Sequence, residues 1–121
     1  PSGAGRPVVS DRYAAWSFGQ NERAIWFGQL TEDGRFEAFQ LPIEGGRLEP
    51  LAFLGHTLLI QDTQTNPSPV IAFNLMTGRE TSFIGSVAIG SLQVDQNARV
   101  IVWLDSVDSY QFRVRRFESE N

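Results

Sequence analysis

The sequence repeats itself with a period of 43 to 44 residues. The segments Tyr13–Ser17, Thr57–Gln61 and Val100–Leu104 align as one apolar strand, so that equivalent residues lie 44 and then 43 positions apart. In each copy a short apolar strand and a tight turn precede this segment, and a polar loop and a third strand follow it. Such a repeat restricts the fold to architectures in which one small structural unit occurs three times.

The third and fourth strands extend the same pattern. The third strands align as Ala24–Phe27, Val70–Phe73 and Gln111–Val114. In the first two copies a Gly-Arg turn, at Gly34 and at Gly78, leads into a fourth strand. The whole pattern predicts short strands without a helix. The predicted strands are Val8–Ser10, Tyr13–Phe18, Ala24–Leu30, Phe36–Leu41, Leu51–Leu54, Thr57–Gln61, Val70–Leu75, Glu80–Ile84, Ser91–Asp95, Arg99–Leu104 and Tyr110–Phe117.

Four short strands per period are typical of the blade of a β-propeller. The second strand of each copy is almost continuously apolar, as expected of a strand buried on both faces between stacked blades, whereas the fourth strand alternates and carries charge. We therefore expect an all-β fold of antiparallel four-stranded blade repeats. A β-trefoil, which also has three repeats, and a β-sandwich are the alternatives.

The repeats resemble the blades of TolB-like β-propellers. Tyr13–Ser17, with its Trp-Ser ending, and the turn Leu75–Arg79 are the closest matches, and Asp95–Arg99 lies where that family often has an Asp-Gly turn. We expect a flexible N-terminal linker over 1–7, followed by one all-β domain with repeats at about 8–48, 49–88 and 89–121.

The third repeat ends after its third strand, so the expected product is a three-blade arc rather than a closed ring. Each end of such an arc leaves an apolar blade face open. We expect this partial propeller to belong to a longer chain, to be completed by a second copy, or to be covered by another protein.

The composition excludes several kinds of chemistry. The 121 residues include no cysteine and one histidine, which excludes disulfides, thiol nucleophiles and ordinary zinc sites. His56 lies in a predicted turn, and the chain has no nucleophile elbow. The loops Asp62–Asn66 and Asp105–Ser109 offer oxygen ligands without the spacing of a calcium loop, so hydrogen-bonded turns are expected there. We therefore expect no enzymatic activity, no cofactor and no metal.

Charge and hydropathy narrow the range of partners. The net charge is −4, which argues against a nucleic-acid groove. No apolar run approaches the roughly 18 residues that a membrane helix needs. The resemblance to propellers of secreted or periplasmic proteins favours an extracytoplasmic location.

Aromatic and arginine side chains are the candidate binding residues. Trp16 and Trp103 occupy equivalent positions, at which burial in the core is expected. Trp26 points away from its two strand neighbours, so it could contact a protein or a sugar, or be buried between blades. Arg113 and Arg115 share one face of the last strand, where they would protect an open sheet edge or bind an acidic partner.

These features favour a non-catalytic binding or scaffolding module that acts through protein–protein contacts in a larger assembly, with a protein partner or a homo-oligomer. One alternative is a lectin-like carbohydrate-binding trefoil with a sugar or other small ligand at Trp26. The other is a fragment of a propeller enzyme whose catalytic residues lie on other blades.

Overall fold

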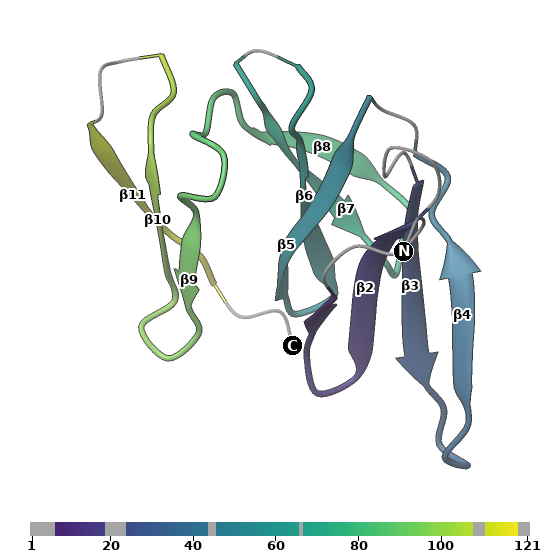
Figure 1. Cartoon of the computed structure of the whole chain (residues 1–121). Helices are drawn as coiled ribbons and strands as arrows, with labels where there is room; N and C mark the ends of the chain where they lie inside the picture. Colours follow the sequence, from purple (N-terminus) through teal and green to yellow (C-terminus); the bar gives the residue numbers. More distant parts are fainter. Residues whose placement is uncertain (1–6, 19–23, 44–45, 66, 108–110, 119–121) are drawn as a thin grey trace.

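A computed structural model describes residues 7–18, 24–43, 46–65, 67–107 and 111–118, and these residues form strands and no helix (Figure 1). The strands are β1 (Val8–Val9), β2 (Tyr13–Phe18), β3 (Ala24–Leu30), β4 (Phe36–Gln40), β5 (Leu48–Leu54), β6 (Thr57–Asp62), β7 (Val70–Asn74), β8 (Glu80–Ile84), β9 (Gln93–Asp95), β10 (Val100–Leu104) and β11 (Phe112–Arg116). The all-β prediction is confirmed, and each predicted strand overlaps an observed one. Within these ranges no helix is long and apolar enough to cross a membrane. The predicted linker lies, except for Pro7, outside the described residues.

The strands form three antiparallel sheets, each a meander that follows chain order. Sheet 1 contains β1 to β4, sheet 2 contains β5 to β8, and sheet 3 contains β9 to β11. No backbone ladder joins two of these sheets in the described part of the chain. Three separate sheets are not the two layers of a β-sandwich, nor the shared barrel in which a trefoil joins its repeats.

The sheets lie side by side in chain order, with sheet 2 between the other two (Figure 1). Two apolar clusters hold them together. The cluster between sheets 1 and 2 contains Tyr13, Ala15, Ile25, Leu41, Ile43, Leu48, Phe53, Leu58, Ile60 and Phe73. The cluster between sheets 2 and 3 contains Leu54, Leu59, Val70, Ala72, Ile84, Val87, Ile101 and Trp103.

The central strands of the three sheets differ in burial. In β6, Leu58, Leu59 and Ile60 are all fully buried, because a neighbouring sheet covers each face of sheet 2. In β2 and β10 burial alternates from one residue to the next. The prediction that all three are buried on both faces is therefore right for β6 and wrong for β2 and β10, whose outer faces no other described segment covers.

The strand register corrects the alignment of the repeats. Trp16 lies opposite Trp26, Ile60 opposite Ile71, and Trp103 opposite Arg113. Trp26, Ile71 and Arg113 are therefore equivalent, and the predicted alignment of the third strand is wrong by one residue in the second repeat. Every residue from 70 to 73 is apolar, so the hydropathy pattern did not distinguish the two registers.

Strand β5 is longer than predicted. The predicted strand begins after Pro50, but the observed strand begins at Leu48, one residue before the predicted repeat boundary, and continues through the proline. β5 is an edge strand, and its pairing shifts between Pro50 and Ala52. An edge strand tolerates proline because one side of its backbone needs no donor.

A pair of stacked rings and two hydrogen bonds also join the sheets. The Tyr13 ring stacks on Phe53 with 5.6 Å between ring centroids, and its hydroxyl hydrogen-bonds His56 Nδ1 at 2.8 Å. Gln96 Nε2 in sheet 3 donates to the Phe53 carbonyl oxygen in sheet 2 at 2.8 Å. His56, predicted as a surface turn residue, does lie in the β5–β6 turn, but it is half-buried and links sheet 2 to sheet 1.

Replacing Gln61 by leucine should destabilise the fold. Gln61 is 1% exposed, and its Nε2 donates to the carbonyl oxygens of Ser68 at 3.2 Å and Val87 at 2.8 Å. Gln61→Leu removes this donor from both oxygens, although the Ser68 oxygen keeps its bond from the Val87 amide at 3.2 Å, so the free energy of unfolding should fall by about 1–3 kcal/mol in urea titrations. Gln29→Leu, at an exposed position in β3, is the control and should change it by less than about 0.5 kcal/mol. Equal effects of the two substitutions would contradict this account.

Replacing Arg99 by glycine should stabilise the protein. Arg99 is exposed in the β9–β10 turn and has φ of 56°, a left-handed conformation that non-glycine residues adopt at a cost. Arg99→Gly should raise the free energy of unfolding by about 0.5–1 kcal/mol, because the relieved strain exceeds the added entropy of the unfolded chain. Thermal melts measure this change in stability. Arg99→Ala keeps the strain and should give no gain in the same melts.

Candidate binding surfaces

The outer face of sheet 1 is apolar and uncovered. Tyr13, Ala15 and Ser17 are buried toward sheet 2, so the alternate residues of β2 point the other way. The register of β1, β3 and β4 places further apolar residues on this outer face. We call it the leading face: Val9, Ala14, Trp16, Phe18, Trp26, Gly28, Leu30 and Phe36.

An aromatic ring covers the one position of the leading face that has no side chain. The Phe36 ring from β4 lies on Gly28, where an added Cβ would be 1.9 Å from the ring carbon Cζ. The equivalent position in sheet 2 is Phe73, a buried residue of the sheet 1–sheet 2 cluster. Phe36 thus places an aromatic ring on sheet 1 at the position where sheet 2 has the ring of Phe73.

The outer face of sheet 3 has the same character. Ile101 and Trp103 are buried toward sheet 2, which turns the alternate residues of β10 and their partners in β11 outward. We call this the trailing face: Val102, Leu104, Phe112 and Val114. Phe112 is 71% exposed and Val114 66%.

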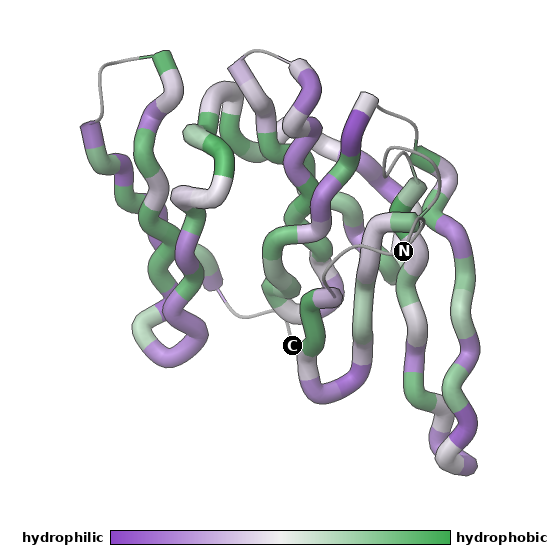
Figure 2. Tube along the Cα trace, viewed as in Figure 1, coloured by the Kyte–Doolittle hydropathy of each residue, from purple (hydrophilic) through white to green (hydrophobic). Residues whose placement is uncertain are grey.

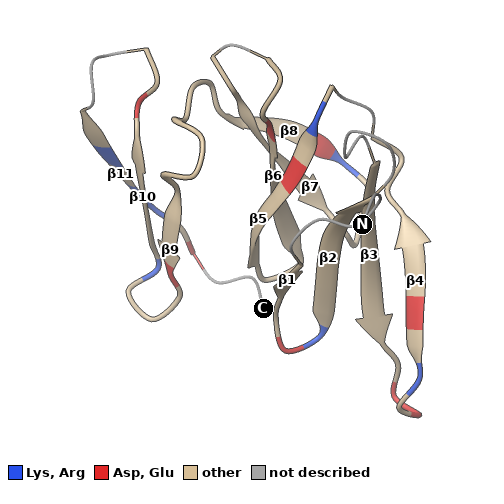
Figure 3. Ribbon diagram, in the orientation of Figure 1, with Lys and Arg blue, Asp and Glu red and all other residues tan. Residues whose placement is uncertain are grey.

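Charged residues avoid the centres of both faces. Strands β2, β3 and β10 contain none, and Figure 3 shows the charges of sheets 1 and 2 mainly at strand ends and turns. Figure 2 shows apolar stretches along these strands. On the trailing face, Asp95 and Arg116 lie beyond the apolar residues, at either side of Val100. Contiguous apolar surface of this kind is uncommon on folded proteins, which makes both faces candidate interaction sites.

The three tryptophans have different environments. Trp103 is buried as predicted. Trp16 is half-buried and lies on the leading face, so the prediction that it belongs to the core is wrong: sheet 1 has no neighbour on that side within the described residues. Trp26 lies beside it on the same face, also half-buried, and points away from Ile25 as predicted.

Arg113 and Arg115 share one face of β11, as predicted, but that face is turned toward sheet 2. Arg113 Nε lies 3.4 Å from Asp105 Oδ2. The Arg115 guanidinium lies 4.1 Å from the centre of the Phe83 ring and donates to the Phe83 carbonyl oxygen at 2.9 Å. The structure therefore does not bring them together with Trp26, and their binding of an acidic partner stays a prediction.

The two acidic loops are held by their own hydrogen bonds. Asp62 accepts from the Gln64 amide at 3.1 Å and from the Thr65 hydroxyl at 2.9 Å. Burial raises the pKa of Asp62, but these hydrogen bonds outweigh it and leave the pKa below the ordinary 3.8. Asp105 Oδ1 likewise accepts from the Val107 amide at 2.8 Å. The prediction of hydrogen-bonded turns is confirmed for 62–65 and 105–107, while Asn66 and residues 108–109 lie outside the described residues. The described residues contain no cluster of acidic or histidine side chains suited to a metal.

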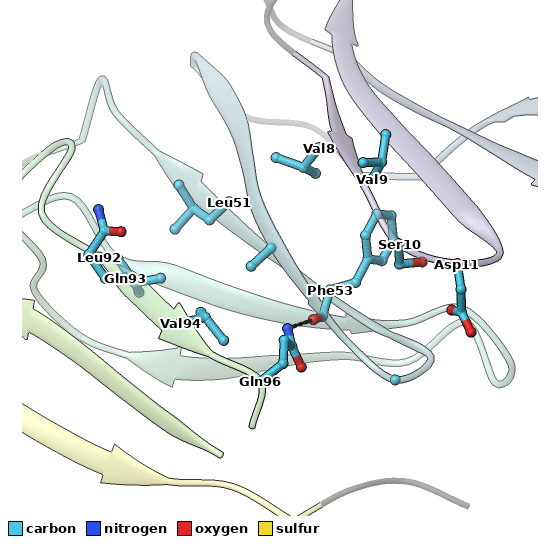
Figure 4. Close-up of a pocket in the computed structure, with 12 residues that line it drawn as sticks. Val8, Val9, Ser10, Asp11, Leu51, Phe53, Leu92, Gln93, Val94 and Gln96 are labelled. Carbon is cyan, nitrogen blue, oxygen red and sulfur yellow. Dashed lines mark hydrogen bonds between the residues drawn. The ribbon is translucent and has the colours of Figure 1, made fainter. Parts of the chain in front are cut away.

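The first strands of all three sheets line one cleft of about 680 Å³ (Figure 4). Its walls come from β1, β5 and β9 and from the turns that follow them. Figure 4 shows both aliphatic and polar side chains around it, with Asp11 at one side and the hydrogen bond from Gln96 to Phe53 joining two of its walls. The lining residues offer one carboxylate and no second ionisable group, so they include no acid–base pair.

Comparison with known proteins adds no relative, since no family model, curated protein or solved structure matches the chain. The molecule is an all-β protein of stacked antiparallel sheets with two apolar end faces that no other described segment covers. The sequence predicted an open apolar face at each end of the arc, but of the residues on these faces it named only Trp26 as a binding candidate. The other members could have been found by applying the alternation of β2 and β10 to the first and last repeats.

Arg115 should matter for stability more than its neighbour Arg116. Arg115→Ala removes the contact with the Phe83 ring and the hydrogen bond to its carbonyl, so the free energy of unfolding should fall by about 1 kcal/mol. Arg116→Ala, on the opposite face of β11, is the matched control and should be neutral in the same urea titration. If Arg116→Ala costs as much as Arg115→Ala, Arg115 has no specific role at the sheet 2–sheet 3 junction.

Proposed function

We propose that this protein is a non-catalytic scaffolding module that binds partner proteins through the leading and trailing faces, as the blades of a β-propeller bind one another. The observation that carries the proposal is internal to the molecule. Residues equivalent to Trp16, Val102 and Phe112 occur elsewhere in the chain, and there they are buried against a neighbouring sheet.

The leading face is equivalent to the faces by which sheets 2 and 3 pack on the sheet before them. Trp16 is equivalent to Ile60 and Trp103, which are 0% and 8% exposed. Trp26 is equivalent to Ile71, which packs against the sheet 1–sheet 2 cluster. Sheet 1 thus has the same kind of surface without a sheet in front of it.

The trailing face is equivalent to the faces by which sheets 1 and 2 pack on the sheet after them. Phe112 is equivalent to Ile25 and Val70, both fully buried. Val102 is equivalent to Ala15 and Leu59, also fully buried. Burying an exposed phenylalanine gains about 1.5–3 kcal/mol, which gives the trailing face a free-energy reason to bind.

These equivalences define the chemistry of the partner. The surface that fits each end is an antiparallel β-sheet with a largely apolar face. The common cleft between β1, β5 and β9 supports the same interpretation, because the first strands of propeller blades surround a shared axis. The resemblance to TolB-like blades agrees with it.

A protein partner explains the face better than a sugar does. A sugar site combines an aromatic ring with polar groups that bind the hydroxyls. Trp26 is surrounded on the leading face by Trp16, Gly28 and the Phe36 ring, and its β4 partner Gln40 is the one polar side chain that the register places beside it.

Association in solution tests the proposal. Analytical ultracentrifugation over a concentration series should detect association of the wild-type chain, and Trp16→Glu combined with Val114→Glu should abolish it, because each introduces a charge into one apolar face. The matched control is Met76→Glu, since Met76 is 70% exposed in the β7–β8 turn, away from both faces. Circular dichroism checks that all variants fold. A wild-type chain that stays at 13.5 kDa, with sedimentation unaffected by the face substitutions, would contradict the proposal.

A further inference from the structure

We propose that the partner sheet is supplied by a second copy of this chain, so that the trailing face of each copy covers the leading face of the other. This inference rests on the proposed function and names its partner. The pair would form a closed ring of stacked sheets related by a two-fold axis.

The first argument is that one chain carries both halves of a single type of interface. At each internal junction, a face equivalent to the trailing face packs on a face equivalent to the leading face. Among the described residues, the trailing face of sheet 3 has no leading face to pack on, and the leading face of sheet 1 has no trailing face packed on it. An unrelated partner would have to match only one of them, whereas a second copy supplies both at once.

The second argument comes from the contacts that the internal junctions assign to each position. Between sheets 2 and 3, Trp103 is in one cluster with Val70 and Ala72. Trp16 is the equivalent of Trp103 on the leading face. By the strand register, the equivalents of Val70 and Ala72 are Phe112 and Val114 on the trailing face. The same arrangement between copies therefore places the half-buried Trp16 against the most exposed apolar residues of sheet 3.

The number of sheets favours two copies, because two copies supply six sheets, within the roughly four to eight blades typical of closed propellers, whereas three copies supply nine. Contacts between two different faces generate a ring when the rotation closes and a filament when it does not. In a two-membered ring the two junctions are identical and form together, so the second one is intramolecular and is favoured by a high effective concentration. No end face then remains free for further growth.

Stoichiometry and complementation test this pairing. Sedimentation equilibrium of the wild-type chain should give a single species of twice the 13.5 kDa chain mass. Trp16→Glu alone and Val114→Glu alone should each be monomeric, since either substitution disrupts both junctions of the ring. An equimolar mixture of the two variants should form a heterodimer, because one junction then joins two unaltered faces. Its Kd should exceed that of the wild-type pair by about tenfold or more.

The remaining outcomes separate this inference from the proposed function. Filaments or larger oligomers that depend on the two faces, or a dimer of wild type whose single variants do not complement each other, would overturn the two-copy ring and leave the faces as binding surfaces. If the wild-type chain is monomeric at all concentrations, and Met76→Glu and the face variants behave in the same way, both the two-copy ring and the proposed function are wrong. Thermal melts of each variant show whether lost association reflects the face or a lost fold.

Discussion

Burial of β6 on both of its faces is the constraint on which the rest of the molecule depends. Leu58, Leu59 and Ile60 are consecutive, apolar and fully buried, and consecutive residues of a strand point to opposite sides. Each side therefore needs its own apolar layer, at about 1.5–3 kcal/mol per side chain covered. Sheets 1 and 3 are those layers. The central strands of sheets 1 and 3, β2 and β10, also need an apolar layer on each face. Within the described residues, only one face of each strand is covered.

Two of the polar contacts between sheets have the spacing of the sequence repeat. The pairs Tyr13–His56 and Phe53–Gln96 each span 43 residues, which is the period of the sequence. In both, a side chain from the turn after the first strand of a sheet reaches the sheet before it. Such partly buried hydrogen bonds fix how one sheet is set against the next, because only one placement satisfies them. Each junction thus has a hydrogen bond from the turn after a first strand, and no described sheet precedes the corresponding turn of sheet 1, Asp11–Arg12.

The sequence predicted the strands because apolar segments and turn residues alternate clearly along it, and the left-handed φ of Gly34 and Gly78 agrees with their predicted turns. Register and orientation needed the structure. The uniformly apolar segment 70–73 is compatible with two registers, and its partner strand decides between them. The common face of Arg113 and Arg115 followed from strand periodicity, but the sheet they face depends on the stacking order. Burial of Trp16 was mispredicted because its equivalence to Trp103 was taken to imply the same burial, whereas no described sheet covers this side of sheet 1.

The difference between Trp16 and Trp103 shows how the ends of this stack differ from its middle. The two residues are equivalent in the repeat, yet one is buried and the other lies on an uncovered face. In proteins built from stacked repeats, terminal repeats that face water have a polar outer surface. Sheet 1 has not been adapted in this way, since β2 and β3 contain no charged residue and the Phe36 ring even fills the gap over Gly28. Sheet 3 exposes Phe112 and Val114 in the same manner. Both end sheets therefore have the apolar outer faces of internal sheets, and in an internal sheet such a face is covered by the neighbouring sheet.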